Sequence, residues 1–447
     1  MNDLRTLLDA ATGAVPDDEI NRAERAVATA RRVRSTRVVA VIVAAVAAVL
    51  AGGVVVPLLT RLGTIDPAGP GEEPGLPDQI YPVPLHAPSV GEGAALGQPA
   101  AYLLGGVQSG DGWFGESCCH MAVVGASTDE YAFVNVPGMT EVAGGGALNA
   151  RLAPDGRVIA YATADGVRLL NLVDGSGRTL DAPQGWQVWS VLAWSGDGTR
   201  LAVAIGNPAP GGTEKIGLAT VTVADRASWS VPDLGVQWNG SPNGVALSPD
   251  GSQIALSQDG DLRVASVDPG AARVLMTGIG TVDPKVVWSR DGVRIAVLGF
   301  ATSPTRADGP DGSTTDWFRG RYVDLASGNI GVFGVEHGFK LSALLGFGGQ
   351  FHLLALVSPS GAAGRYTFER LEVTTVPLRQ STVTRLPDAI DPYQVDVAAA
   401  LIESPSRSST EPDDITGVIA LVAAGAALVA LVAVLMIGRL WRRHTLR

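Results

Sequence analysis

A twelve-residue pattern occurs four times between residues 150 and 297, and it constrains the fold more than any other feature of the chain. The copies read ARLAPDGRVIAY, LAWSGDGTRLAV, VALSPDGSQIAL and VVWSRDGVRIAV, each with an Asp-Gly turn between two apolar runs. Asp-Gly favours a tight β-hairpin, because Gly accepts a positive φ and Asp can bond its own backbone. The turn aspartates, 42, 53 and 41 residues apart, are Asp155, Asp197, Asp250 and Asp291. Such a period with about four strands is typical of a β-propeller blade.

The segments around the four copies predict an all-β fold, with one six-bladed β-propeller over residues 95–403. The first blade has only three apparent strands, and no copy of the pattern precedes them. Residues 394–402 (QVDVAAALI) can supply its missing innermost strand, which closes the ring and removes exposed sheet edges. Seven blades are the main alternative, because the first and last segments diverge from the pattern.

The blade pattern resembles the repeat of TolB-type, WD-like β-propellers. The similarity rests on W-S-x-D-G-x-x-I-A-V, which residues 288–297 match, and it is strong only in the four copies. In that family the motif marks the fold, and the periplasmic propeller serves protein binding. The resemblance therefore implies a protein-binding role and assigns no binding residue.

Two uncharged stretches, residues 38–60 and 415–438, predict transmembrane α-helices on either side of the propeller. Each can cross a hydrocarbon core of ~30 Å at about 1.5 Å per residue. Four arginines precede the first stretch and four follow the second: Arg31, Arg32, Arg34 and Arg37, then Arg439, Arg442, Arg443 and Arg447. By the positive-inside rule both termini are cytoplasmic and the propeller lies outside the plasma membrane. The alternative, a signal-peptide core at residues 38–50, needs an unusually long leader.

The remaining segments flank these parts. Residues 1–37 form a cytoplasmic N-terminal segment with helical periodicity, and residues 439–447 a cytoplasmic tail. Residues 61–94 form a Pro/Gly-rich linker, for which we expect an extended tether without a core of its own. Residues 404–414 form a second linker. The order of span, propeller and span resembles actinobacterial membrane proteins that carry repeat domains.

The predicted outer part is acidic, with 22 Lys and Arg against 38 Asp and Glu. This balance excludes nucleic acid as an expected partner, because binding a phosphate backbone requires clustered cations. We expect a cell-envelope protein or ligand as the partner of the propeller, and the lipid bilayer around the spans. Residues 1–37 offer a surface for a cytoplasmic partner.

The two cysteines are adjacent, Cys118 and Cys119, and lie in a loop of the predicted outer part. Since that compartment is oxidising, a vicinal disulfide is the first interpretation. Two free or buried thiols, an intermolecular bridge, and a soft-metal site with His120 and Met121 are alternatives. Four donors in a row do not converge easily on one ion, so we expect no metal there.

Sequence motifs for catalysis are missing. The chain has no G-x-S-x-G, no H-E-x-x-H and no phosphate-binding loop. Asp308, Asp311 and Asp316 share one loop but lack the spacing of an EF-hand. We therefore predict neither an enzyme nor a bound cofactor.

Aromatic residues in loops are the candidate binding residues. Trp194 and Trp288 take the same place in the repeat, which indicates core packing. Other aromatic residues fall in loops that we expect on one face, opposite the Asp-Gly turns, where a partner would bind. These residues are Trp113, Phe114, Trp186, Trp238, Trp317 and Tyr393.

Together these features predict a membrane-anchored, extracytoplasmic propeller that acts as a non-enzymatic protein-binding or envelope-sensing module. One alternative is a transmembrane regulator that acts on a cytoplasmic partner such as a sigma factor. Another is an enzyme that uses the central pocket of the propeller, which would need a convergent set of titratable side chains in the channel.

Overall fold

The structure is a computed structural model that describes residues 73–412 apart from 85–86, 108–119, 140–148, 208–214, 225–226, 233–243, 269–271, 280–284, 299–319, 334–338, 349–351, 360–365, 373–378, 388–393 and 410. Thr64–Asp413 form one compact unit, and the fold described below is that of this unit alone. The predicted spans at residues 38–60 and 415–438 lie outside the described residues, as do residues 1–37 and 439–447. Within the described part of the chain, no helix has the length and apolar character needed to cross a membrane.

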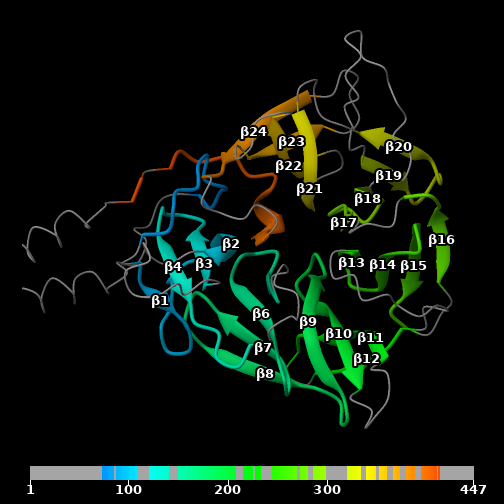
Figure 1. Ribbon diagram of the computed structural model, residues 1–447, viewed down its shortest axis with the longest axis horizontal. Helices are drawn as coiled ribbons and strands as arrows, with labels where there is room; N and C mark the ends of the chain where they lie inside the picture. Colours follow the sequence, from blue (N-terminus) through cyan, green and yellow to red (C-terminus); the bar gives the residue numbers. More distant parts are fainter. Residues whose placement is uncertain are drawn as a thin grey trace, which may run out of the picture. The chain divides into compact units, whose positions relative to one another are not determined.

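Six β-sheets surround a common centre, so the fold is an all-β, six-bladed propeller (Figure 1). Blades two to six are antiparallel and four-stranded. From the centre outward, blade two has β5 (Ala150–Leu152), β6 (Val158–Thr163), β7 (Gly166–Asn171) and β8 (Gly177–Asp181), and blade three has β9 (Gln187–Trp194), β10 (Arg200–Asn207), β11 (Lys215–Thr222) and β12 (Trp229–Ser230). Blade four has β13 (Val245–Leu247), β14 (Gln253–Gln258), β15 (Asp261–Ser266) and β16 (Arg273–Met276). Blade five has β17 (Lys285–Trp288), β18 (Arg294–Leu298), β19 (Gly320–Asp324) and β20 (Ile330–Phe333), and blade six has β21 (Phe339–Phe347), β22 (His352–Pro359), β23 (Thr367–Glu372) and β24 (Arg379–Arg385).

The first blade is built from both ends of the propeller, as the sequence predicts, but the closing strand is shorter than the predicted residues 394–402, because Ala399–Leu401 form a 3-10 helix. Its middle strands are β2 (Ala100–Val107), β3 (His120–Gly125) and β4 (Tyr131–Val134), and its innermost strand is β25 (Val395–Val397). β25 pairs antiparallel with β2, with Val397 opposite Tyr102. A strand from the C-terminal end therefore closes the ring.

The Asp-Gly turns of the repeat have the geometry that their residues require. In the third copy, the carboxylate of Asp250 accepts hydrogen bonds from the Ser248 hydroxyl at 2.6 Å and the Ser252 backbone N–H at 3.0 Å. Gly251 has a φ of 68°, in the region that Gly enters without steric cost. The copies at Asp197 and Asp291 repeat these bonds. The turn of blade three also contacts the next blade, since Asp197 donates its backbone N–H to Pro249 O at 2.8 Å.

The hydrophobic core lies between neighbouring blades. Successive side chains of a strand point to opposite faces of its sheet, so each strand serves two cores. In β6, Ile159 and Tyr161 pack in the cluster shared with blade one, whereas Ala160 and Ala162 pack in the cluster shared with blade three. This alternation makes each blade depend on both of its neighbours.

The described part of the predicted linker, residues 73–94, has no core of its own but packs into the core of the propeller. Leu76 and Ile80 are fully buried and belong to the cluster of blade one. A short strand, β1 (Ser89–Val90), pairs parallel with β4 and makes blade one five-stranded. β1 covers the outer edge of the first sheet, and Leu76 and Ile80 pack in a core that blades one and six share.

Candidate functional site

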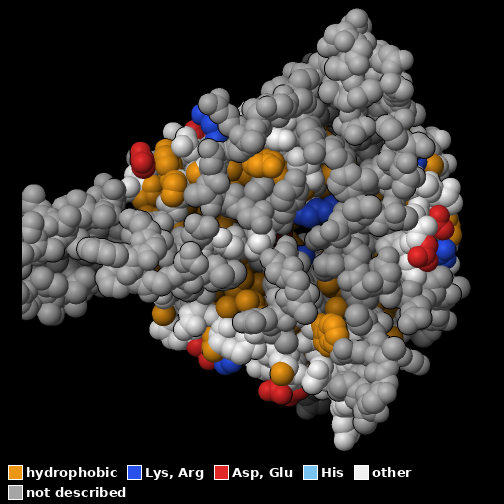
Figure 2. All heavy atoms as spheres, in the orientation of Figure 1, with side chains coloured by type: hydrophobic (Ala, Val, Ile, Leu, Met, Phe, Trp, Pro, Cys, Tyr) orange, Lys and Arg blue, Asp and Glu red, His pale blue; other side chains and the backbone are white. Residues whose placement is uncertain are grey.

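A cavity of about 200 Å³ lies at the centre of the ring, between the six innermost strands β5, β9, β13, β17, β21 and β25. One water needs only about 10–15 Å³ of such volume, so the cavity can hold a small organic molecule. Figure 2 shows Lys and Arg side chains inside the hollow near the middle of the face. The ionisable side chains that line it are Arg151, Lys285, Arg290 and Asp396.

Each copy of the repeat places one residue, four positions before the turn aspartate, against this cavity. In three copies that residue is small or apolar: Ala193, Ala246 and Val287. In blade two it is Arg151, which alternates with the buried Ala150 and Leu152. The closing strand brings Asp396 to the cavity between the buried Val395 and Val397. Two charged side chains therefore occupy a position that is otherwise apolar.

Asp396 fastens the closing strand to blade two. Its carboxylate accepts the Leu152 backbone N–H at 2.7 Å and the Val397 backbone N–H at 3.1 Å. Burial raises the pKa of Asp396, while the charges of Arg151 and Lys285 and the two N–H donors oppose that rise. Each carboxylate oxygen has a backbone donor, and the donor from Leu152 belongs to blade two. The carboxylate therefore joins the closing strand to blade two and stabilises the closed ring.

Arg151 is held by the backbone of its own and the next blade. Its Nε donates to Leu192 O at 3.0 Å and its Nη1 to Ala150 O at 3.1 Å. The indole of Trp194 donates to Arg151 O at 3.1 Å, which fixes the same strand from the other side. Burial lowers the pKa of Arg151 and the nearby Asp396 raises it, but a guanidinium remains protonated at any physiological pH. Arg151 is therefore a fixed positive charge at the wall of the cavity.

Lys285 is the ionisable group whose protonation is most affected by this environment. Burial and the positive charge of Arg151 lower the pKa of Lys285 to about 8, although Asp396 acts in the opposite direction. No hydrogen bond is found for its ammonium group within the described part of the chain. At neutral pH the group is still mostly charged, because its pKa lies above 7.

The rest of the wall is largely apolar. Trp288 is buried and donates its indole N–H to Gly292 O at 3.2 Å, so both repeat tryptophans have the packing role that the sequence indicates. Val287 and Leu345 complete an apolar side of the cavity. The described residues contain no group of His, Cys, Asp and Glu side chains that could hold a metal ion. The chemistry available here is that of a cationic cavity with apolar walls.

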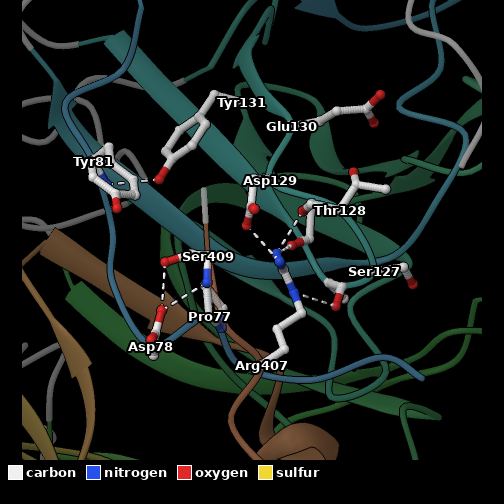
Figure 3. Close-up of polar contacts among 12 residues, drawn as sticks. Pro77, Asp78, Tyr81, Ser127, Thr128, Asp129, Glu130, Tyr131, Arg407 and Ser409 are labelled. Carbon is white, nitrogen blue, oxygen red and sulfur yellow. Dashed lines mark hydrogen bonds and ion pairs between the residues drawn. The ribbon is translucent and has the colours of Figure 1, made fainter. Parts of the chain in front are cut away.

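A second polar cluster joins the segments on either side of the propeller (Figure 3). The guanidinium of Arg407 donates to the carbonyl oxygens of the β3–β4 turn, Gly125 at 3.0 Å, Ala126 at 3.1 Å and Thr128 at 2.6 Å, and it pairs with Asp129. We call these contacts the clasp. Turns after third strands lie on the same face as the Asp-Gly turns, so the clasp is on that face.

The backbone of Arg407 also pairs with the N-terminal linker. Its N–H donates to Leu76 O at 2.9 Å and its carbonyl accepts from the Asp78 N–H at 2.8 Å. Ser409 donates its N–H and its hydroxyl to the carboxylate of Asp78, at 2.8 and 2.6 Å. The two segments that flank the propeller therefore run side by side where they reach the blades.

Of the six predicted aromatic binding residues, the structure describes only Trp186. Trp186 is half-buried and packs against the cluster between blades two and three, which is an ordinary structural role. The other predicted residues lie outside the described residues: Trp113, Phe114, Trp238, Trp317 and Tyr393, together with Cys118 and Cys119.

The charged residues of the cavity were not predicted from the sequence. One signal was available for Arg151, because the same position holds Ala or Val in the other three copies. A second was the position of Lys285, one of three lysines in the chain, at the start of an innermost strand. Their convergence with Asp396 depends on the closed ring, which joins residues 244 positions apart.

Fold and cavity define the protein as a closed six-bladed propeller with a charged central cavity. No family model and no curated protein matches the chain. Solved structures similar to it include an oligogalacturonate lyase in complex with manganese, at 13% identity and a TM-score of 0.41, covering 64% of this chain and 76% of that one. A candidate TolB from Agrobacterium tumefaciens has 16% identity and a TM-score of 0.35, covering 53% and 80%. The nidogen/laminin complex has 9% identity and a TM-score of 0.39, covering 67% and 98%. At these identities the likeness concerns the fold alone.

Proposed function

We propose that the protein is a non-enzymatic binding or sensing module, held outside the plasma membrane by spans at residues 38–60 and 415–438. The observation that carries the proposal is the clasp together with the backbone bonds of Arg407 to Leu76 and Asp78, because these contacts hold both flanking segments at one place on the propeller. Two membrane spans whose linkers leave the propeller at adjacent positions can tether it without distorting the ring of blades. The opposite face, with the long loops that follow second strands, then remains available to a partner.

The topology is tested by labelling single cysteines in intact cells. In a background with Cys118 and Cys119 replaced by serine, Ser406→Cys should react with a membrane-impermeant maleimide, because Ser406 is exposed on the C-terminal segment. Ser35→Cys should react only after the membrane is permeabilised. Reaction of both cysteines from the same side would exclude a propeller between two spans.

Partner binding is tested with the full-length chain purified in mild detergent and incubated with cell-envelope extract. Simultaneous replacement of Trp113, Trp238 and Trp317 by alanine should abolish capture of an envelope partner. If the triple variant still captures the partner, the face that carries these loops is not the binding surface. Capture of a cytoplasmic protein that depends on residues 1–37 would favour the alternative of a transmembrane regulator, for example of a sigma factor.

An enzyme that uses the central pocket is the second candidate, and the cavity gives it a specific basis. Arg151, Lys285 and Asp396 are a convergent set of titratable side chains, and the lowered pKa of Lys285 increases the fraction of free amine at neutral pH. An amine catalyst would form an imine with a small 2-oxo acid, and borohydride would reduce that imine to a stable adduct. Mass spectrometry that finds such an adduct on Lys285, and none in Lys285→Arg, would favour the enzyme.

A further inference from the structure

We propose that the central cavity binds a small organic anion, whose carboxylate or phosphate group lies against Lys285 and Arg151 and whose apolar part lies against Val287 and Leu345. This inference deepens the proposed binding function and rests on it. It names the chemical class of the ligand at a site distinct from the loop face.

The charges of the cavity favour an anion. Among the described residues that line it, three of the four ionisable side chains are cations, namely Arg151, Lys285 and Arg290, and the fourth is the carboxylate of Asp396. The balance is positive whether Asp396 is ionised or protonated. A cation or a metal ion would enter against this charge, whereas an anion is attracted by it.

The hydrogen bonding also leaves a place for an acceptor. Arg151 is positioned by carbonyl oxygens of two blades, and both oxygens of Asp396 have backbone donors. Lys285 has three donor hydrogens and no hydrogen bond within the described part of the chain. Lys285 is partly buried, and an ammonium group that has lost part of its water is stabilised by a charged acceptor. A carboxylate or phosphate oxygen beside Lys285 would supply that acceptor through a charge-assisted hydrogen bond.

The size and lining of the cavity limit the rest of the ligand. A volume of about 200 Å³ is below the 300–1,000 Å³ range of common ligand pockets, so it suits a small molecule rather than a polymer. Val287, Leu345 and the ring of Trp288 provide apolar contact for a short hydrocarbon or aromatic part. A small carboxylic acid or phosphate ester combines both requirements.

The test is calorimetric titration of the full-length chain in detergent with benzoate and with inorganic phosphate, and with benzamide as the uncharged control. We expect saturable binding of at least one of the two anions and none of benzamide. Lys285→Gln should weaken anion binding at least tenfold, while Lys285→Arg, which keeps the charge, should retain most of it. Circular dichroism verifies that both variants keep the fold. Comparing benzoate with phosphate shows whether the site prefers a carboxylate or a phosphate group.

A pH series adds a second readout that a merely structural lysine would not affect. The charged groups that act on Lys285 are Arg151 and Asp396; burial raises the pKa of Asp396, and the charges of Arg151 and Lys285 oppose that rise. Between pH 7 and 9 the charged fraction of a lysine with a pKa of about 8 falls about tenfold, so anion affinity should fall by up to that factor. In Lys285→Arg it should change less.

Two results would overturn the proposal: no saturable binding of either anion, or equal affinity in the wild type and Lys285→Gln. Either result leaves the proposed tethered module intact, because cysteine labelling and partner capture do not involve the cavity. Conversely, if the chain binds the anion but the cysteines at positions 35 and 406 react from the same side of the membrane, the anion site is supported and the propeller between two spans is excluded.

Discussion

Arg407→Ala should detach the segments that flank the propeller and leave the blades folded. The guanidinium serves three carbonyl oxygens and Asp129, and the Arg407 side chain is only 11% exposed. A hydrogen bond to a charged group contributes about 1.5–3 kcal/mol, and breaking a buried ion pair costs about 3–5 kcal/mol. Because Thr128 and Asp129 are partly exposed, water can replace part of these contacts, and we expect a loss of about 2–4 kcal/mol.

This loss should appear as local opening of the clasp. The backbone N–H groups of Asp78 and Ile80 donate to Arg407 O and Arg385 O, both at 2.8 Å, and they exchange with solvent when the linker separates from the blades. If the clasp loses about 2–4 kcal/mol, their exchange should accelerate about 30- to 1,000-fold. Strand β14 in blade four should keep its wild-type exchange rate. Hydrogen exchange read by mass spectrometry measures both regions in one sample.

Two variants serve as controls. Arg407→Lys keeps the charge but loses the forked donor geometry, so it should fall between the wild type and alanine. Arg178→Ala removes an exposed arginine that also donates to two carbonyl oxygens, and it should leave exchange unchanged. The reasoning fails if Arg407→Ala leaves the exchange of Asp78 within a factor of about two of the wild type. It also fails if β14 accelerates equally.

Two further variants test the turns. In Gly156→Ala the new Cβ would lie 2.1 Å from Ala100 O at a φ of 74°, so chemical denaturation should show a loss of more than about 2 kcal/mol in the free energy of unfolding. The control Gly185→Ala has a φ of 83° and no atom within 4 Å of the new Cβ, so it should lose only about 1 kcal/mol. Equal losses in the two variants would show that the contact with Ala100 has no effect. Hydrogen bonds, first of all from Ser248, lower the pKa of Asp250 below its ordinary value of 3.8. The ionised carboxylate therefore stabilises the fold fully above pH 3.8, and this stabilisation is lost as the pH falls through the lower pKa of the folded protein. The advantage of the wild type over Asp250→Asn should therefore shrink in denaturation series below about pH 4, and an advantage constant from pH 7 to pH 3 would contradict this.

Most of the fold could be predicted because its determinants are local. Each Asp-Gly turn encodes its own hairpin through the conformation of Gly251 and its equivalents, and period-two alternation encodes the two faces of each strand. Ring closure by β25 followed from a missing innermost strand in blade one. The packing of residues 74–94 was not predicted, because Leu76 and Ile80 become buried only against a sheet made by other parts of the chain.

The central site could not be found from local pattern, because no segment contains it. Arg151, Lys285 and Asp396 come from blades two, five and one, and each has ordinary neighbours in the sequence. Sequence patterns favoured aromatic loop residues instead, and the one that the structure describes, Trp186, packs against the core between two blades. Comparing equivalent positions across the copies would have singled out Arg151, since it is the charged member of an apolar set.

Lys285→Met should make the protein more stable while it removes the proposed anion site. The folded pKa of Lys285 is lowered from 10.5 to about 8, so folding opposes its charge, and below pH 8 this costs up to about 3 kcal/mol. As the pH rises from 8 to 10.5 the unfolded chain binds more protons than the folded one, and the cost disappears. Methionine has a similar length and no charge. We therefore expect the melting temperature of Lys285→Met to exceed that of the wild type at pH 7, with a difference that narrows by pH 10. Burial raises the pKa of Tyr102, and the effect of this tyrosine on stability is the same in both proteins and cancels in the comparison. A variant that is less stable at pH 7, or a difference independent of pH, would show that the Lys285 charge is already compensated in the free protein, and the cavity would then have no need of an anion.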